Sequence, residues 1–229
     1  MSINFTEEEM REIDEFVKQI DITNTTLVFN YGEYYQSQLA KKVEELSQRS
    51  GKVDTKHIHS TINRITQVID SFSEYKSNRP NPISLRMRFK KDMQTIHDLK
   101  NDLSSQSLTL DDCNDTFADC YTEIDKLYII ITKYIIAGDK KLEIVERDIL
   151  PKLKEQSSDS FASGEEYAGM IICVKFFKDR LTSLRISQTN AIQLKQSISM
   201  QQDSYTRLQK LVNSILNNTI PAFEHCLML

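Results

Sequence analysis

The sequence predicts an all-α protein, an elongated bundle of long antiparallel helices that pack like a coiled coil. From Phe117 to Ile149 the apolar residues are spaced by four and three positions without a break, which is typical of a helical seam facing partner helices. The seam positions are Phe117, Tyr121, Ile124, Tyr128, Ile131, Ile135, Gly138, Leu142, Val145 and Ile149. Such a seam runs along about 48 Å of helix. The 229 residues include only 5 glycines and 4 prolines, so few positions favour a sharp turn.

The amino-terminal part is predicted to form a short acidic helix followed by a helical hairpin. Thr6 and Glu9 have the spacing of a capping box, which starts the first helix. The polar residues 21–26 are suited to cap a second helix that runs to about Gln48. A third helix is predicted to begin near Asp54, because apolar residues recur after it at helical spacing.

A proline-containing hinge is predicted to divide the chain. Pro80 and Pro82 disfavour helix through the segment around them. We therefore expect amino-terminal helices at residues 1–77, a hinge at residues 78–83, and a long antiparallel helical hairpin at residues 84–229.

The long hairpin has one ambiguous stretch and one clear turn. The apolar pattern is weakest at residues 104–112, which are either continuous helix or a tight turn. Pro151 is expected to kink or end the first long helix. A polar loop at residues 156–163 follows, and Ser163 with Glu166 forms a capping box for the last helix. An apolar residue then recurs every seven positions, at Met170, Phe177, Leu184, Ala191, Ile198, Tyr205 and Val212.

Two features of the hairpin predict specific contacts. Gly138 occupies a seam position, where a glycine costs about 1 kcal/mol relative to alanine, so we expect a close helix crossing there. On the last helix Leu194, Leu208 and Ile215 form an apolar stripe beside the main row. We expect this stripe to be under-covered and to bind a protein partner by helix packing, either another protein or a second copy of the chain.

No set of residues has the spacing of a catalytic, cofactor-binding or metal site. Cys113 and Cys120 lie seven positions apart, about 10.5 Å along one helix, which exceeds the roughly 7 Å limit for a disulfide. No pair of cysteines or histidines has zinc-ligand spacing. We therefore expect free cysteines, no enzymatic activity and no cofactor.

The charge pattern disfavours one class of partner. With 29 Lys and Arg against 33 Asp and Glu, the net charge is −4, which does not favour nucleic-acid binding. A local basic group, Arg79, Arg86, Arg88, Lys90 and Lys91, is either a solvated helix face or a weak contact with an anionic membrane. No long apolar span or signal-peptide core occurs, so we expect a cytoplasmic protein.

Several short segments resemble one family in the same order along the chain. They are Ile20–Thr23, Phe29–Gly32, Ile124–Tyr128, Tyr134–Glu143, Ile149–Leu153, Arg180–Thr189, Gln193–Gln201 and Ile215–Ala222. Together they resemble the toxic-anion-resistance family, whose members are TelA-like or YaaN-like. The resemblance implies a role in resistance to tellurite and other toxic oxyanions, and it implies no catalytic residues. Members usually continue with a long charged helix, which we expect to be absent or supplied by another protein, because the sequence ends at Leu229.

These observations lead to three hypotheses for function. The first is a non-catalytic helical scaffold or adaptor in a tellurite- or stress-resistance system. The second is a peripheral membrane-associated helical protein. The third is a thiol-dependent enzyme that reduces or sequesters the oxyanion through Cys113, Cys120 or Cys173. The first is favoured because the long seams indicate helix packing and no cation cluster adjoins the thiols.

Overall fold

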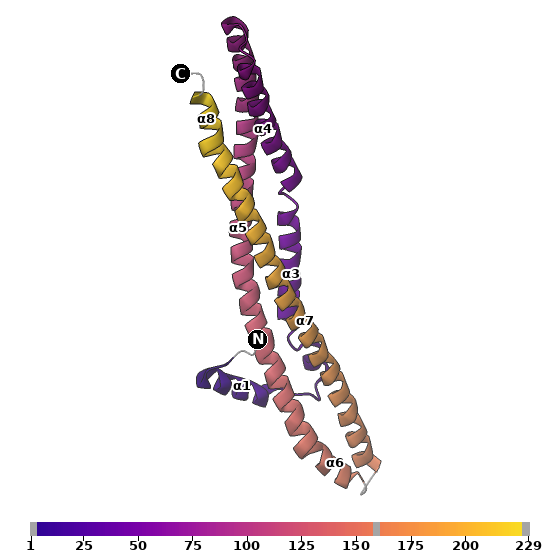
Figure 1. Cartoon of the computed structure of the whole chain (residues 1–229). Helices are drawn as coiled ribbons and strands as arrows, with labels where there is room; N and C mark the ends of the chain where they lie inside the picture. The colour runs from indigo at the N-terminus through magenta and orange to yellow at the C-terminus, as the bar shows by residue number, and fades with distance from the viewer. Residues whose placement is uncertain (1–3, 158–160, 226–229) are drawn as a thin grey trace. The chain divides into compact units, whose positions relative to one another are not determined.

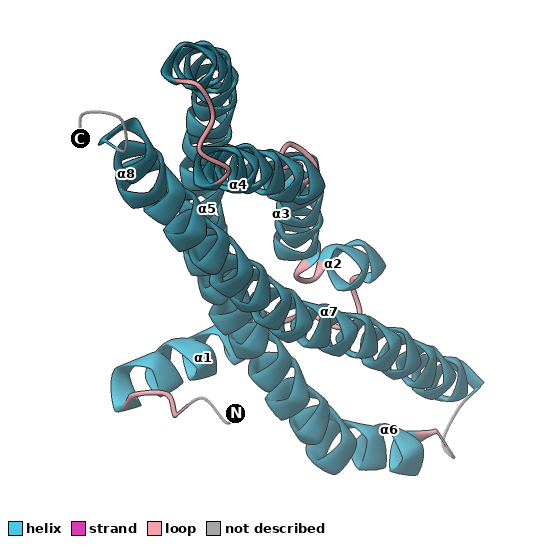
Figure 2. Cartoon of the chain, turned by 45° about the horizontal axis from the view of Figure 1, so that its top comes forward, coloured by secondary structure: helices cyan, strands magenta, loops and turns pink. Residues whose placement is uncertain are grey.

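The predicted all-α fold is confirmed by a computed structural model that describes residues 4–157 and 161–225. Every regular element among these residues is a helix, as Figure 2 shows. The helices are α1 (Glu7–Gln19), α2 (Thr25–Asn30), α3 (Glu33–Ser50), α4 (Thr55–Ser77), α5 (Pro82–Ile144), η1 (Val145–Ile149), α6 (Leu150–Gln156), α7 (Phe161–Ser214), η2 (Ile215–Thr219) and α8 (Ile220–His225). Within the described ranges, no helix combines the length and the apolar composition that a membrane span requires.

The amino-terminal helices differ from the prediction at one turn. The capping box is present, because Thr6 Oγ1 accepts a hydrogen bond from the Glu9 N–H and the Glu9 carboxylate accepts one from the Thr6 N–H. The single helix predicted up to about Gln48 is instead two helices, α2 and α3. The chain turns between them at Gly32, whose φ is +71°. Glycine adopts this left-handed conformation without the steric cost that a side chain brings.

The two longest helices, α5 and α7, are continuous (Figure 1). The ambiguous residues 104–112 belong to α5 and contain no turn. Helix α7 begins at Phe161, so the predicted capping residue Ser163 does not start it, and the side chain of Ser163 lies outside the described residues.

Each long helix ends in a π-helical turn that precedes a proline. A proline has no N–H to donate and its ring clashes with the carbonyl four residues earlier. The wider turn avoids this conflict, since Leu150 N–H bonds to the Val145 carbonyl before Pro151. Ile220 N–H bonds to the Ile215 carbonyl in the same way. The break expected at the first proline is therefore a change in helical register.

The chain divides into two compact units. The first contains Met1–Glu44 and Cys120–Ser197, and the second contains Glu45–Asp119 and Ile198–Leu229. Each unit therefore takes one part of α5 and one part of α7. The predicted proline-containing break is the connection between α4 and α5, which lies inside the second unit.

In the first unit, α5 and α7 pack in opposite directions. The Gln188 side-chain amide donates to Thr132 Oγ1 at 2.7 Å. Arg185 on α7 pairs with Asp139, which lies further along α5. Residue numbers on α5 thus increase as those of their partners on α7 decrease, so the two helices are antiparallel. The shared seam is buried, as the sequence predicts, at Ile124, Ile131, Val145, Phe177, Leu181 and Leu184.

In the second unit, the same two helices are again antiparallel. The Gln209 side-chain amide donates to Ser107 Oγ at 2.7 Å. The rings of Phe117 and Tyr205 stack with centroids 5.6 Å apart. Helix α4 adds the apolar side chains Ile58, Ile65 and Phe72, which are fully or almost fully buried.

Candidate functional site

Three segments that resemble the toxic-anion-resistance family meet in the first unit, at the turn between α2 and α3. The Tyr31 hydroxyl donates a hydrogen bond to the Tyr134 carbonyl of α5 at 2.7 Å. Arg180 of α7 donates from Nε to the Tyr31 carbonyl, also at 2.7 Å. One residue is therefore bound to both long helices, through its side chain on one side and its backbone on the other. We call this arrangement of Tyr31, Gly32, Tyr134, Gly138 and Arg180 the junction.

Two glycines of the junction give space to leucines of α7. A Cβ atom at Gly32 would lie 2.7 Å from Leu184 Cδ2. A Cβ atom at Gly138 would lie 3.2 Å from Leu181 Cγ, and the two methyl groups of Leu181 would be closer still. Both leucines are fully buried, so they have little room to move aside. The close contact that the sequence predicted at Gly138 is thus made with a side chain of α7.

An aromatic cluster surrounds the junction and attaches α1 to it. Neighbouring ring centroids in the cluster are 4.9–6.0 Å apart, a spacing at which aromatic side chains stabilise one another. Burial raises the pKa of Tyr31 and raises that of Tyr134 to about 12, so both hydroxyls stay protonated at neutral pH. The members are Phe16 of α1, Tyr31, Tyr35, Tyr134 and Phe177.

Ion pairs add to the attachment of α1. Lys133 lies 3.2 Å from a carboxylate oxygen of Glu9 and 3.2 Å from one of Glu12. Lys140 lies 2.7 Å from a carboxylate oxygen of Asp14. These pairs are partly exposed, so each contributes less than the aromatic packing.

The Arg180 guanidinium is partly buried beside the turn between α2 and α3, where it binds the Tyr31 carbonyl. Burial lowers its pKa, and the nearby Glu33 carboxylate acts in the opposite direction. Its Nη2 atom is buried and has no hydrogen-bond partner among the described residues. A cavity of about 250 Å³ adjoins the junction and is lined by its aromatic rings and by residues of the segment before α2.

An exposed apolar surface lies beside the junction. Phe29 of α2 is 63% exposed, and its ring centroid is 6.1 Å from that of Phe176 of α7, which is 43% exposed. Ile172, one helical turn before Phe176, is 54% exposed. We call Phe29, Ile172 and Phe176 the α2–α7 apolar surface.

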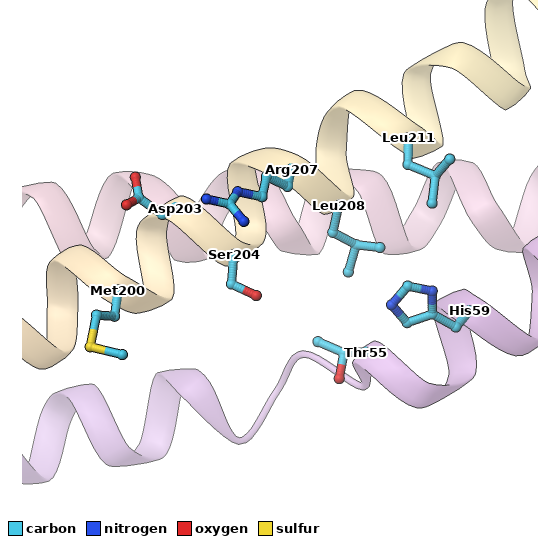
Figure 3. A pocket seen from close by; sticks show the side chains of 8 residues that line it. All are labelled: Thr55, His59, Met200, Asp203, Ser204, Arg207, Leu208 and Leu211. Carbon is cyan, nitrogen blue, oxygen red and sulfur yellow. The ribbon is translucent and has the colours of Figure 1, made fainter.

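A separate groove lies in the second unit, between the start of α4 and α7. Figure 3 shows Ser204, Leu208 and His59 directed into a space of about 560 Å³, whereas Asp203 points away from it. No hydrogen bond joins His59 to Ser204 among the described residues. The lining residues are Thr55, His59, Met200, Asp203, Ser204, Arg207, Leu208 and Leu211.

The three leucine and isoleucine residues predicted to bind a partner do not form one exposed stripe. Leu208 and Ile215 are buried in the second unit, at 6% and 9% exposure. Leu194 is half-buried and belongs to the first unit. The expected partner surface is therefore not found at these positions, because the other helices of the chain cover the last two.

The described cysteines are placed as packing residues. Cys113 and Cys120 are buried on the continuous helix α5, and Cys173 is half-buried on α7. The Cys113 thiol donates to the Arg49 carbonyl at 3.4 Å, and burial raises its pKa, which lowers its thiolate fraction. Cys226 lies outside the described residues. Within those residues, no three His, Cys, Asp or Glu side chains are grouped as metal ligands.

Comparison with known proteins identifies the family. The chain matches the family described as Toxic anion resistance protein (TelA) over residues 13–229. It belongs to this family, as the resemblance of its segments predicted. No solved structure matches it.

The similar proteins are longer than this chain. A TelA-like protein of Staphylococcus saprophyticus is 22% identical over 98% of the chain and 64% of its own length. The protein YceH of Bacillus subtilis is 22% identical over 93% of the chain and 62% of its own length. A TelA-like protein of Staphylococcus aureus is 20% identical, and 62% of its length is covered. The chain thus spans slightly less than two thirds of these relatives.

Proposed function

We propose that this chain is a non-catalytic helical scaffold that acts in a toxic-anion-resistance system. Membership of the TelA family supports the system. The junction supports the scaffold role, because its polar groups bind other parts of the chain. The Tyr31 hydroxyl and carbonyl are both bonded to other helices, and Gly32 and Gly138 accommodate buried leucines. The residues that resemble the family thereby fix the relative positions of α2, α5 and α7 within the first unit.

The observation that carries this proposal is the position of Phe29, two residues before Tyr31. The hydrogen bonds of Tyr31 hold the end of α2 in place. Phe29 is thereby kept next to the Phe176 ring, with much of its own ring exposed. Large exposed apolar groups that lie together are typical of surfaces that bind other proteins. In a scaffold, the junction would keep the α2–α7 apolar surface in one arrangement. A partner could then pack a helix against this surface.

The test is to make that surface polar without disturbing the junction. Phe29→Ser combined with Phe176→Ser should leave circular dichroism unchanged and the melting temperature only slightly lower, because Phe29 is 63% exposed and Phe176 is 43% exposed. The same variant should lose protection against tellurite when it replaces the natural protein in its host cells. Growth at increasing tellurite concentration measures the effect.

A matched control distinguishes this surface from apolar surface in general. Ile186 and Ile192 lie on α7 in the first unit and are 58% and 38% exposed. Ile186→Ser combined with Ile192→Ser should retain resistance. Full resistance of the Phe29 and Phe176 variant, or an equal loss in the control, would contradict a partner surface at these two rings.

The alternative, a thiol-dependent enzyme, requires an accessible thiolate. Cys113 does not fit this requirement, because it is buried and its pKa is raised. Cys173 is the more accessible of the described cysteines. Resistance in cells that carry a cysteine-free protein separates this alternative from the scaffold.

A further inference from the structure

The start of α5 carries a concentration of positive charge in a chain whose net charge is −4. Residues 79–91 contain five arginines and lysines and no aspartate or glutamate. Figure 1 shows the turn between α4 and α5 at the top of the view, where this segment begins. The Asn81 side chain accepts a hydrogen bond from the Ile83 N–H at 2.9 Å, which fixes the first turn of α5.

Two large apolar side chains project from the same face of this turn. Ile83 and Met87 are each 71% exposed. They are four residues apart, so they are neighbours on the helix surface. At 100° per residue, Arg86 and Lys90 lie on one side of this pair and Lys91 lies on the other. All three are exposed, and none forms an ion pair within the described part of the chain.

Arg88, which the sequence grouped with these cations, has a different role. It donates from Nε to the Asp92 carboxylate at 2.7 Å and from Nη2 to Ser71 Oγ at 3.1 Å. Its guanidinium also lies over the Tyr75 ring, 5.9 Å from the centroid. Arg88 is therefore engaged within the second unit, and we do not include it in the face described below. Through the same pair it neutralises Asp92, an acidic residue close to the basic face.

We propose that this face, formed by Ile83, Met87, Arg86, Lys90 and Lys91, docks on the surface of an anionic lipid bilayer. The two apolar side chains enter the boundary between headgroups and acyl chains, while the three cations contact lipid phosphates. A bilayer offers negative charge directly above an apolar layer. That combination matches an apolar pair flanked by cations, whereas a nucleic acid or an acidic protein surface supplies the charge alone. This docking is independent of the partner surface proposed for the first unit.

The first experiment measures binding of the full chain to vesicles by co-sedimentation. The protein should bind vesicles of phosphatidylglycerol mixed with phosphatidylcholine, should bind phosphatidylcholine alone far more weakly, and should dissociate as salt is added. Each cation near an anionic surface strengthens binding about fivefold. Arg86→Gln, Lys90→Gln and Lys91→Gln together should therefore weaken binding by about a hundredfold.

A control variant with the same change in net charge tests whether the position matters. Lys41, Lys56 and Lys210 are exposed elsewhere on the chain, and their combined replacement by Gln should leave binding within about twofold of the natural protein. An equal loss in the control and in the basic-face variant would overturn the proposal, since it would indicate a response to net charge.

The second experiment uses the absence of tryptophan from the sequence. Met87→Trp introduces a single tryptophan, whose emission, excited at wavelengths that tyrosine does not absorb, should shift to shorter wavelength when anionic vesicles are added. Leu108→Trp is the control, because Leu108 is 72% exposed on the same helix and lies away from the basic face. An unshifted emission for the first variant, or an equal shift for both, would overturn the insertion of this face. Binding to duplex DNA or polyglutamate without binding to vesicles would also overturn the proposal.

Discussion

Gly138→Leu is expected to lower the melting temperature of the chain substantially. A side chain at this position meets Leu181, which is fully buried between α5 and α7 of the first unit. Forcing extra volume into a packed core costs about 1–3 kcal/mol. For a chain of this length, each kcal/mol corresponds to about 2–4 °C, so we expect a decrease of about 2–12 °C, measured by circular dichroism during heating.

Gly164→Leu is the matched control for this substitution. Gly164 lies within α7. Among the described atoms, a Cβ atom there would meet only the Ser157 carbonyl, at 3.9 Å. Because leucine favours helix over glycine by about 0.8 kcal/mol, the control should melt at the same or a higher temperature. Equal decreases for the two variants would remove the argument for close packing at Gly138.

Leu208→Lys combined with Ile215→Lys is expected to destabilise the second unit strongly. Both side chains are buried, and loss of a buried aliphatic side chain alone costs about 2–5 kcal/mol per site. Each introduced ammonium group must also be desolvated or must displace its neighbours to reach water. We therefore expect loss of cooperative unfolding or a much lower melting temperature by circular dichroism.

Exposed positions on the same helix provide the comparison for this pair. Met200 and Leu211 of α7 are 74% and 40% exposed. Met200→Lys combined with Leu211→Lys should change the melting temperature little. If the buried pair instead remained fully folded and lost only a binding partner, then these two residues would be the partner surface that the sequence suggested.

The long helices could be predicted because their pattern depends on each helix alone. Residues such as Phe117, Ile124 and Ile131 follow the spacing of one helix face, and the structure buries each of them. Proline removes a hydrogen bond wherever it occurs in a helix, so the break at Pro151 was predictable. The π-helical turn that accommodates Pro151 could not be predicted, because it depends on the backbone geometry of the preceding turn.

The junction could not be assembled from the sequence, because its members are far apart along the chain. The bond from Tyr31 to Tyr134 joins residues separated by 103 positions, and no local pattern indicates such a pair. Gly32 was the local sign of the turn between α2 and α3, yet a glycine within an apolar helical pattern is also compatible with continuous helix. Whether Leu208 is covered, or whether Arg88 is already bonded, likewise depends on neighbouring helices.

We propose that the chain acts through a surface and not through reactive thiols. The direct test is resistance in cells that carry a protein with Cys113→Ala, Cys120→Ala, Cys173→Ser and Cys226→Ser, after its fold has been checked by circular dichroism. Alanine is used at the two sites shown to be fully buried on α5, where a serine hydroxyl would need a partner. The scaffold account predicts full protection against tellurite. A cysteine-free protein that folds normally and gives no protection would contradict it.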